Sequence, residues 1–140
     1  MEVDVIIGAH MMIRKSVLDV AGVFDSDFFL YLEESELSYR IQKQGYKIYS
    51  IPNAHITHFW QQSSKDSSVK LKKDKIKEYY AYSRFVYFEK IYGLKVVKYV
   101  YLLTQFWSVL KILGGNKNDF ITYRTQYCNY KNNLKARNNS

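Results

Sequence analysis

The second half of this sequence contains a long stretch without proline, and this feature restricts its fold more than any other. From residue 74 to residue 134 there is no proline, and glycine occurs only at Gly93 and at the pair Gly114-Gly115. Proline and glycine are the residues least compatible with a helix interior, so uninterrupted runs between them favour helices. The spacing therefore predicts three helices, over roughly 75–92, 95–113 and 117–134.

The middle helix contains an uncharged run, "YVYLLTQFWSVL", from Tyr99 to Leu110. A helix that crosses a bilayer needs about 20 apolar residues, and Lys98 and Lys111 end this run too early. We predict a helix buried at the centre of a small helical subdomain. The alternative is a helix lying in the membrane interface, with Trp107 and the tyrosines at headgroup level and lysines facing lipid phosphates.

The first half has short apolar runs that suggest strands. "VDVIIGAHMMI" is β-branched and predicts a strand that bends or ends at Gly8. "YKIYSIP" and "AHITHFW" predict two further strands, separated by Pro52 and Asn53.

Two helices are expected between these strands. "RKSVLDVAGVF" predicts a short helix with Ser16 as its N-cap and Gly22 just past its end. The second helix should run from about Glu33 to Gln44, with its apolar residues four positions apart, and should stop at Gly45.

Charge divides the chain into two parts. Residues 1–64 hold 5 Lys and Arg against 8 Asp and Glu, whereas residues 65–140 hold 16 against 5, giving −3 and +11. We take 1–64 as one domain and 65–140 as a basic linker with a helical C-terminal region. The basic part suggests an acidic partner, either phospholipid headgroups or nucleic acid, or else only a solvated surface. A lone cysteine, Cys128, indicates a reducing compartment.

Three glutamates at the start of the second helix are candidates for chemistry. Glu33 and Glu34 fall in the first turn, where unpaired backbone N–H groups and the helix dipole favour negative charge. Glu36 precedes Arg40 by four residues, which suits an intrahelical ion pair. Glu34 has no such partner and is our candidate general base. The alternative is that all three acids only cap and solubilise the helix.

The histidines point to a site less directly. His55 and His58 are three residues apart, so a regular strand would turn them to opposite faces and they would not share a metal. His58 ends its predicted strand, a common place for a site residue, and His10 follows Gly8 and Ala9, so the two would reach one pocket if the two strand ends are neighbours. The alternative is that His58 is only packed or hydrogen-bonded. There is no phosphate-binding glycine loop, no HExxH, no nucleophile elbow and no Asp-x-Asp.

A longer pattern combines these residues. The segment "IIGAHMMIRKSVLDVAGVFDSDFFLYLEESELSYRIQKQGYKIYSIPNAHITH" resembles the second half of a family 2 glycosyltransferase catalytic domain, in the bacterial rhamnosyltransferase-like branch that builds cell-surface polysaccharides. "KIKEYYAYSRFVYFEK", with Arg84, resembles the helix that follows in that branch. The matching residues in the first segment are Gly8, Ala9, Arg14, Gly22, Phe24, Asp25, Phe28, Phe29, Tyr31, Glu33, Leu37, Arg40, Gly45, Tyr46, Pro52 and His58.

The resemblance implies a partial GT-A fold, which is an α/β sandwich related to the Rossmann type, followed by the helical subdomain. It implies inverting transfer of a sugar from a nucleotide-diphosphate donor to an acceptor hydroxyl, assisted by Mg²⁺ or Mn²⁺. Glu34 falls at the general-base position, as Glu for the usual Asp, and Glu36 at the second acid. His58 falls near the metal–diphosphate region. The remaining residues expected at the acceptor or donor pocket are Gly8, Ala9, His10, Glu33 and Arg40.

The resemblance covers only the later half of that domain. We therefore expect a chain that binds nucleotide sugar poorly alone, and an exposed sheet edge that favours self-association or packing by the helical tail. We expect a cytoplasmic location, peripheral to the inner face of the plasma membrane, and a glycan or lipid-linked acceptor.

Two other readings stay open. One is a basic module for anionic lipid or nucleic acid, although nucleic acid is the less expected partner. The other is a purely structural partner surface. The basic module would use Lys70, Lys72, Lys73, Lys75 and Lys77 with Tyr79, Tyr80 and Tyr82.

Overall fold

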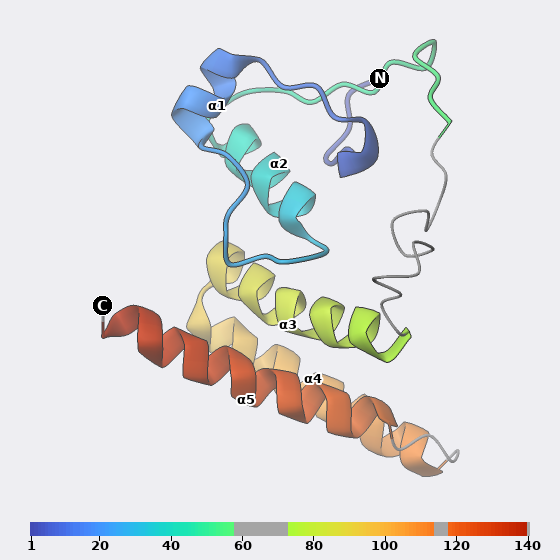
Figure 1. Cartoon of the computed structure of the whole chain (residues 1–140), viewed down its shortest axis with the longest axis vertical. Helices are drawn as coiled ribbons and strands as arrows, with labels where there is room; N and C mark the ends of the chain where they lie inside the picture. Colours follow the sequence, from blue (N-terminus) through green and yellow to red (C-terminus); the bar gives the residue numbers. More distant parts are fainter. Residues whose placement is uncertain (58–72, 114–117, 140) are drawn as a thin grey trace, which may run out of the picture.

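The structure is a computed structural model that describes residues 1–57, 73–113 and 118–139. These residues form a helical fold in two parts (Figure 1). A smaller part contains α1 (Lys15–Ala21) and α2 (Glu33–Lys43). A larger part is a bundle of α3 (Lys73–Tyr92), α4 (Leu94–Leu113) and α5 (Asn118–Asn138), and α3 is the bundle helix that faces α2 of the smaller part.

The predicted α/β sandwich is wrong, because the described residues contain no strand. The extended segments 1–7 and 46–51 run antiparallel but share one isolated bridge, between Glu2 and Tyr49. Around it the Val3 N–H donates to the Ile48 carbonyl at 3.0 Å and the Ser50 N–H to the Met1 carbonyl at 2.8 Å. A lone ribbon of two extended segments is marginal without a third strand or a covering face. In residues 1–57 the apolar pattern therefore produced extended backbone but no sheet.

The three predicted helices of the second half are confirmed as α3, α4 and α5. Gly93, with φ of +83°, separates the first two, and its N–H donates to the Glu89 carbonyl at 2.8 Å. The bundle core is centred on Phe85 and Tyr130, which are almost fully buried. The proposed domain boundary at 64/65 lies outside the described residues and stays a prediction.

The expectation that α4 is buried at the centre of its subdomain is wrong. Its inward side carries Val97, Val100, Thr104 and Ser108, with Tyr101 stacked on Tyr127 at its edge, while most other large side chains of the uncharged run are exposed. The Thr104 and Ser108 hydroxyls donate to carbonyls one turn earlier, at 2.6 and 2.7 Å, so burying them leaves no donor unpaired. Rings from α3 and α5, joined by Tyr101 of α4, fill the core. No helix in the described ranges is long and apolar enough to cross a membrane.

The smaller part has its own core of Val17, Ala21, Leu37 and Ile41. The end of α1 at Gly22, with φ of +80°, is confirmed. The predicted Ser16 cap is wrong: the helix begins at Lys15, and Arg14 occupies the cap position without a side-chain hydrogen bond.

The loop between α1 and α2 joins the two parts. The Lys90 Nζ lies 2.5 Å from Asp25 Oδ2 and 2.6 Å from Asp27 Oδ2. Arg137 at the end of α5 also pairs with Asp27, and with Glu89 at 2.8 Å. Phe28, on the same loop, is buried in the bundle core. The loop that precedes α2 is therefore held by helices from the other half of the chain.

Candidate functional site

The start of α2 is held in an unusual backbone conformation. Tyr31 and Leu32 have φ of 69° and 68°, the left-handed region that costs non-glycine residues about 1–2 kcal/mol each. Leu32 packs against the bundle core, and the Ser83 hydroxyl of α3 donates to the Leu30 carbonyl at 2.7 Å. Contacts with α3 therefore compensate the strain at the turn that positions Glu33 and Glu34.

The predicted ion pair between Glu36 and Arg40 is confirmed. The Arg40 Nε and Nη2 lie 2.7 and 2.8 Å from the two carboxylate oxygens of Glu36, which is buried. Arg40 also donates to the Ala21 and Val23 carbonyls, the latter at 2.7 Å. Gly22 has φ of +80°, which strains any other residue, and a Cβ there would also lie 3.0 Å from Arg40 Nη1. Arg40 thereby fastens α1 to α2.

Glu34 lies against the backbone at Gly8. The Gly8 N–H donates to Glu34 Oε1 at 3.2 Å, across 26 positions of sequence. A Cβ at Gly8 would lie 3.0 Å from Glu34 Cγ and 3.4 Å from Glu34 Oε1. A side chain at position 8 would therefore displace the Glu34 side chain, which explains why this position is a glycine.

A pocket of about 440 Å³ opens beside this contact. Gly8, Ala9, Glu33 and Glu34, all named from the sequence, line it together. The other lining residues are Ile7, Phe24 and Phe28. Both phenylalanines belong to the residue pattern shared with family 2 glycosyltransferases, and this pattern could have predicted that they line the pocket. No sequence signal indicated Ser83, because its role depends on where α3 packs.

The remaining predicted site residues lie elsewhere. His10 is exposed at the end of a short 3₁₀ turn, Gly8–His10, and does not line the pocket. Arg40 is engaged as described and is not among the lining residues. His58 is outside the described residues. The chemical roles of all the named residues stay predictions.

The two glutamates of the pocket have different surroundings. Burial raises the pKa of Glu33, and a hydrogen bond from its own backbone N–H partly opposes this rise. The neighbouring Glu34 raises the pKa further, through its like charge and by accepting a hydrogen bond from Glu33. Glu33 Oε2 is buried and has no partner among the described residues. Glu33 therefore keeps a proton to higher pH than an ordinary glutamate does. Adjacent carboxyl groups in different environments can divide donor and acceptor roles.

The expected Mg²⁺ or Mn²⁺ has no ligand set in the part of the chain that the structure describes. No group of three or more His, Cys, Asp or Glu residues there could hold a metal ion. The pocket offers only its two adjacent glutamates, whereas such cations prefer about six oxygen ligands.

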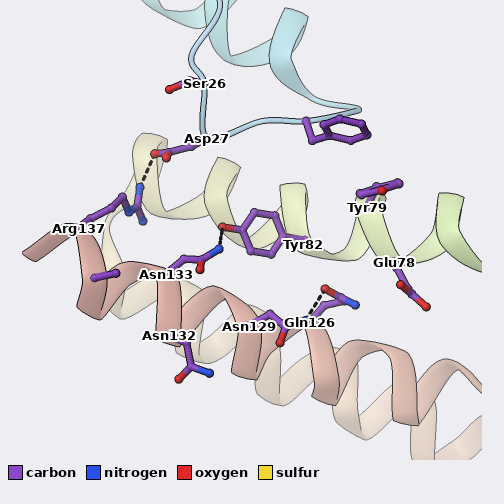
Figure 2. Close-up of a pocket in the computed structure, with 12 residues that line it drawn as sticks. Ser26, Asp27, Glu78, Tyr79, Tyr82, Gln126, Asn129, Asn132, Asn133 and Arg137 are labelled. Atoms are coloured by element: carbon purple, nitrogen blue, oxygen red, sulfur yellow. Dashed lines mark hydrogen bonds and ion pairs between the residues drawn. The ribbon is translucent and has the colours of Figure 1, made fainter.

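A second, larger hollow of about 780 Å³ lies between the loop before α2 and helices α3 and α5 (Figure 2). Figure 2 shows Tyr82 and Asn133 joined across it, the amide donating to the phenol oxygen at 2.8 Å. Four amide side chains from α5 line it: Gln126, Asn129, Asn132 and Asn133. These groups are hydrogen-bond donors and acceptors without the paired carboxyl groups that make the Glu33–Glu34 pocket the better candidate for catalysis.

Two lysines of the proposed basic module form ion pairs within the chain. Lys75 pairs with Glu78 at 3.0 Å and Lys77 with Asp119 at 3.8 Å. Lys70 and Lys72 are outside the described residues. The described contacts do not favour a basic binding function over a pocket-based one.

Comparison with known proteins gives one partial likeness. The N-acetylglucosaminyl-diphospho-decaprenol L-rhamnosyltransferases of two Mycobacterium tuberculosis strains are 31% identical to this chain over 51 residues. The match covers 36% of the chain and 17% of the length of each of these curated relatives. No family model matches the chain, and no solved structure matches it. The likeness supports a relationship to glycosyltransferases.

Proposed function

We propose that this chain carries the acceptor-activating segment of an inverting glycosyltransferase. It would act on a hydroxyl of a cell-surface polysaccharide or lipid-linked acceptor, with a nucleotide-diphosphate sugar as donor. The observation that carries the proposal is the grouping of Gly8, Ala9, Glu33 and Glu34 around one pocket. The partial likeness to rhamnosyltransferases supports the same reaction class.

The reaction assigns one step to Glu34. Its carboxylate takes the proton of the acceptor hydroxyl while the hydroxyl oxygen attacks the anomeric carbon of the donor sugar. The bond from that carbon to the diphosphate breaks, and its electron pair leaves with the nucleotide diphosphate. The Gly8 N–H restrains Glu34 Oε1 through their 3.2 Å hydrogen bond and so orients the carboxylate.

The other lining residues have supporting roles. Glu33, which holds its proton to higher pH than usual, can donate a hydrogen bond to an acceptor oxygen or to Glu34. Phe24 and Phe28 form an apolar wall against which the C–H face of a sugar can pack. The two acids suit the uncharged sugar of the acceptor, so we expect the diphosphate of the donor and that of a lipid-linked acceptor to lie outside this pocket.

The test combines binding with turnover. Acceptor binding is followed by NMR, with N-acetylglucosaminyl diphosphate on a short lipid as the probe and the backbone amides of Gly8 and Glu34 as reporters. Because this chain is expected to bind nucleotide sugar poorly alone, transfer is followed by mass spectrometry with the chain joined to a nucleotide-binding half and supplied with nucleotide-diphosphate rhamnose. We expect Glu34→Gln to cut transfer by about 10²-fold or more while the amide shifts on acceptor binding persist.

Glu78→Gln is the control, because Glu78 lies on α3 away from the pocket and should leave transfer unchanged. Unchanged transfer by Glu34→Gln would remove Glu34 from the base role. An absence of any shift at Gly8 and Glu34 at about 1 mM acceptor, a concentration that matches a binding free energy near −4 kcal/mol, would contradict the pocket assignment.

A further inference from the structure

Helix α4 presents its largest apolar side chains to solvent. Tyr99, Leu102, Leu103, Phe106 and Trp107 are each 60–68% exposed, and Val109 and Leu110 are exposed beside them. Positions 99, 102, 103, 106 and 110 recur at intervals of three and four residues, so they lie on one side of the helix. That side is opposite the buried Val97, Thr104 and Ser108. The described residues do not cover it, and exposed apolar surface of this extent marks an interaction site.

The charges of α4 stand at the ends of this apolar face. Lys95 and Lys98 are exposed near its start, and Lys111 follows its end. Between Leu94 and Leu113 there is no Asp or Glu. An apolar helix face with aromatic residues and flanking lysines is the arrangement of helices that lie in a membrane interface.

We propose that α4 docks the chain on an anionic phospholipid membrane, with its axis parallel to the surface. The exposed side chains Leu102, Leu103, Phe106 and Leu110 enter the boundary between headgroups and acyl chains, and Trp107 and Tyr99 lie at headgroup level. Lys95 and Lys98 face the lipid phosphates, whose negative surface potential attracts them. The bundle stays folded, because Val97, Val100 and the bonded hydroxyl side chains keep the inner side of α4 packed.

A second copy of the chain fits this face less well than a membrane does. In a parallel pair of α4 helices, Lys95 and Lys98 of both copies would meet, and in an antiparallel pair they would approach Lys111. No Asp or Glu on α4 could neutralise these lysines. Lys111 is already paired with Asp119 of its own chain, at 2.9 Å. Anionic headgroups supply the complementary charge that a symmetric dimer lacks.

The experiment uses the full 140-residue chain with vesicles of phosphatidylcholine alone and of phosphatidylcholine mixed with an equal part of phosphatidylglycerol. Cosedimentation measures partitioning, and Trp60→Phe makes Trp107 the single tryptophan. We expect binding to the anionic vesicles with a blue shift of Trp107 emission. Leu102→Gln with Phe106→Gln should lower partitioning by about tenfold or more.

Two matched variants separate apolar from charge effects. Met12→Gln with Val20→Gln changes two exposed apolar residues outside α4 and should leave partitioning unchanged. Lys95→Gln with Lys98→Gln should weaken binding to anionic vesicles by about fivefold for each lysine, with little effect on phosphatidylcholine. Circular dichroism confirms that each variant stays folded.

The proposal is overturned if folded chain fails to bind anionic vesicles, or if the Leu102–Phe106 variant binds as well as the parent. It is also overturned if the parent forms a dimer without binding vesicles and this variant is monomeric, because a second copy would then cover the face. These results do not depend on Glu34, so docking and the proposed transferase chemistry can fail separately.

Discussion

Removing one partner of the buried Glu36–Arg40 pair should destabilise the smaller part of the fold strongly. The Glu36 side chain is 4% exposed and that of Arg40 28%. Arg40→Met would leave the Glu36 carboxylate buried without its cation, and would remove the donor that serves the Ala21 and Val23 carbonyls. Breaking a buried pair in this way costs about 3–5 kcal/mol, and the partial exposure of Arg40 favours the lower end.

The magnitude translates into a measurable melting shift. An unfolding entropy of about 2.1 cal/mol/K per residue gives about 0.3 kcal/mol/K for a chain of this length, so a loss of about 3 kcal/mol lowers Tm by about 10 °C. Circular dichroism during heating and in a urea titration would measure it. Lys47→Met is the control, because Lys47 pairs with Glu2 at 3.0 Å on an exposed surface and should not change Tm measurably.

A double variant tests the cause. Glu36→Leu with Arg40→Met removes both charges and should recover much of the loss, since a buried ion pair can be replaced by apolar groups at little cost. The reasoning is refuted if Arg40→Met melts like the parent, or if the double variant is as unstable as the single one.

Three further predictions follow from the same contacts. Gly8→Ala should lower transfer by tenfold to about 10²-fold, because the new Cβ would displace Glu34. Tm should change little. Transfer equal to that of the parent would contradict the close contact between Gly8 and Glu34. Ser83→Ala should lower the free energy of unfolding by about 1 kcal/mol, measured by urea titration, because the Leu30 carbonyl loses its donor. Burial raises the pKa of Asp25, but the hydrogen bonds from Lys90 and from the Asp27 N–H outweigh it, so the pKa lies below its usual value. Asp25 therefore stabilises the fold above its unfolded pKa, and this stability is lost as pH falls through the lower folded value. Asp25→Asn should flatten the acid limb of a Tm–pH profile, and an unchanged limb would argue against that contribution.

Local interactions explain most of what could be predicted. Helix limits at Gly22, Gly45 and Gly93 follow from residues that adopt positive φ at little cost. The Glu36–Arg40 pair follows from helix spacing alone. The grouping of Gly8 and Ala9 with Glu33 and Glu34 came from a residue pattern, which carries long-range information that spacing does not.

Only the tertiary structure decided whether extended segments became a sheet and which way α4 faces. A strand needs hydrogen-bonding partners from elsewhere, and segments 1–7 and 46–51 have only each other in the described residues. The run from Tyr99 to Leu110 is apolar on most sides, so its periodicity could not say which side packs. The rings of Phe85, Tyr127 and Tyr130 decided it, because they pack against the side of α4 that carries Val97, Val100 and the Tyr101 ring, which stacks on Tyr127. Packing of that kind depends on the shapes of distant residues, which no single stretch of sequence contains.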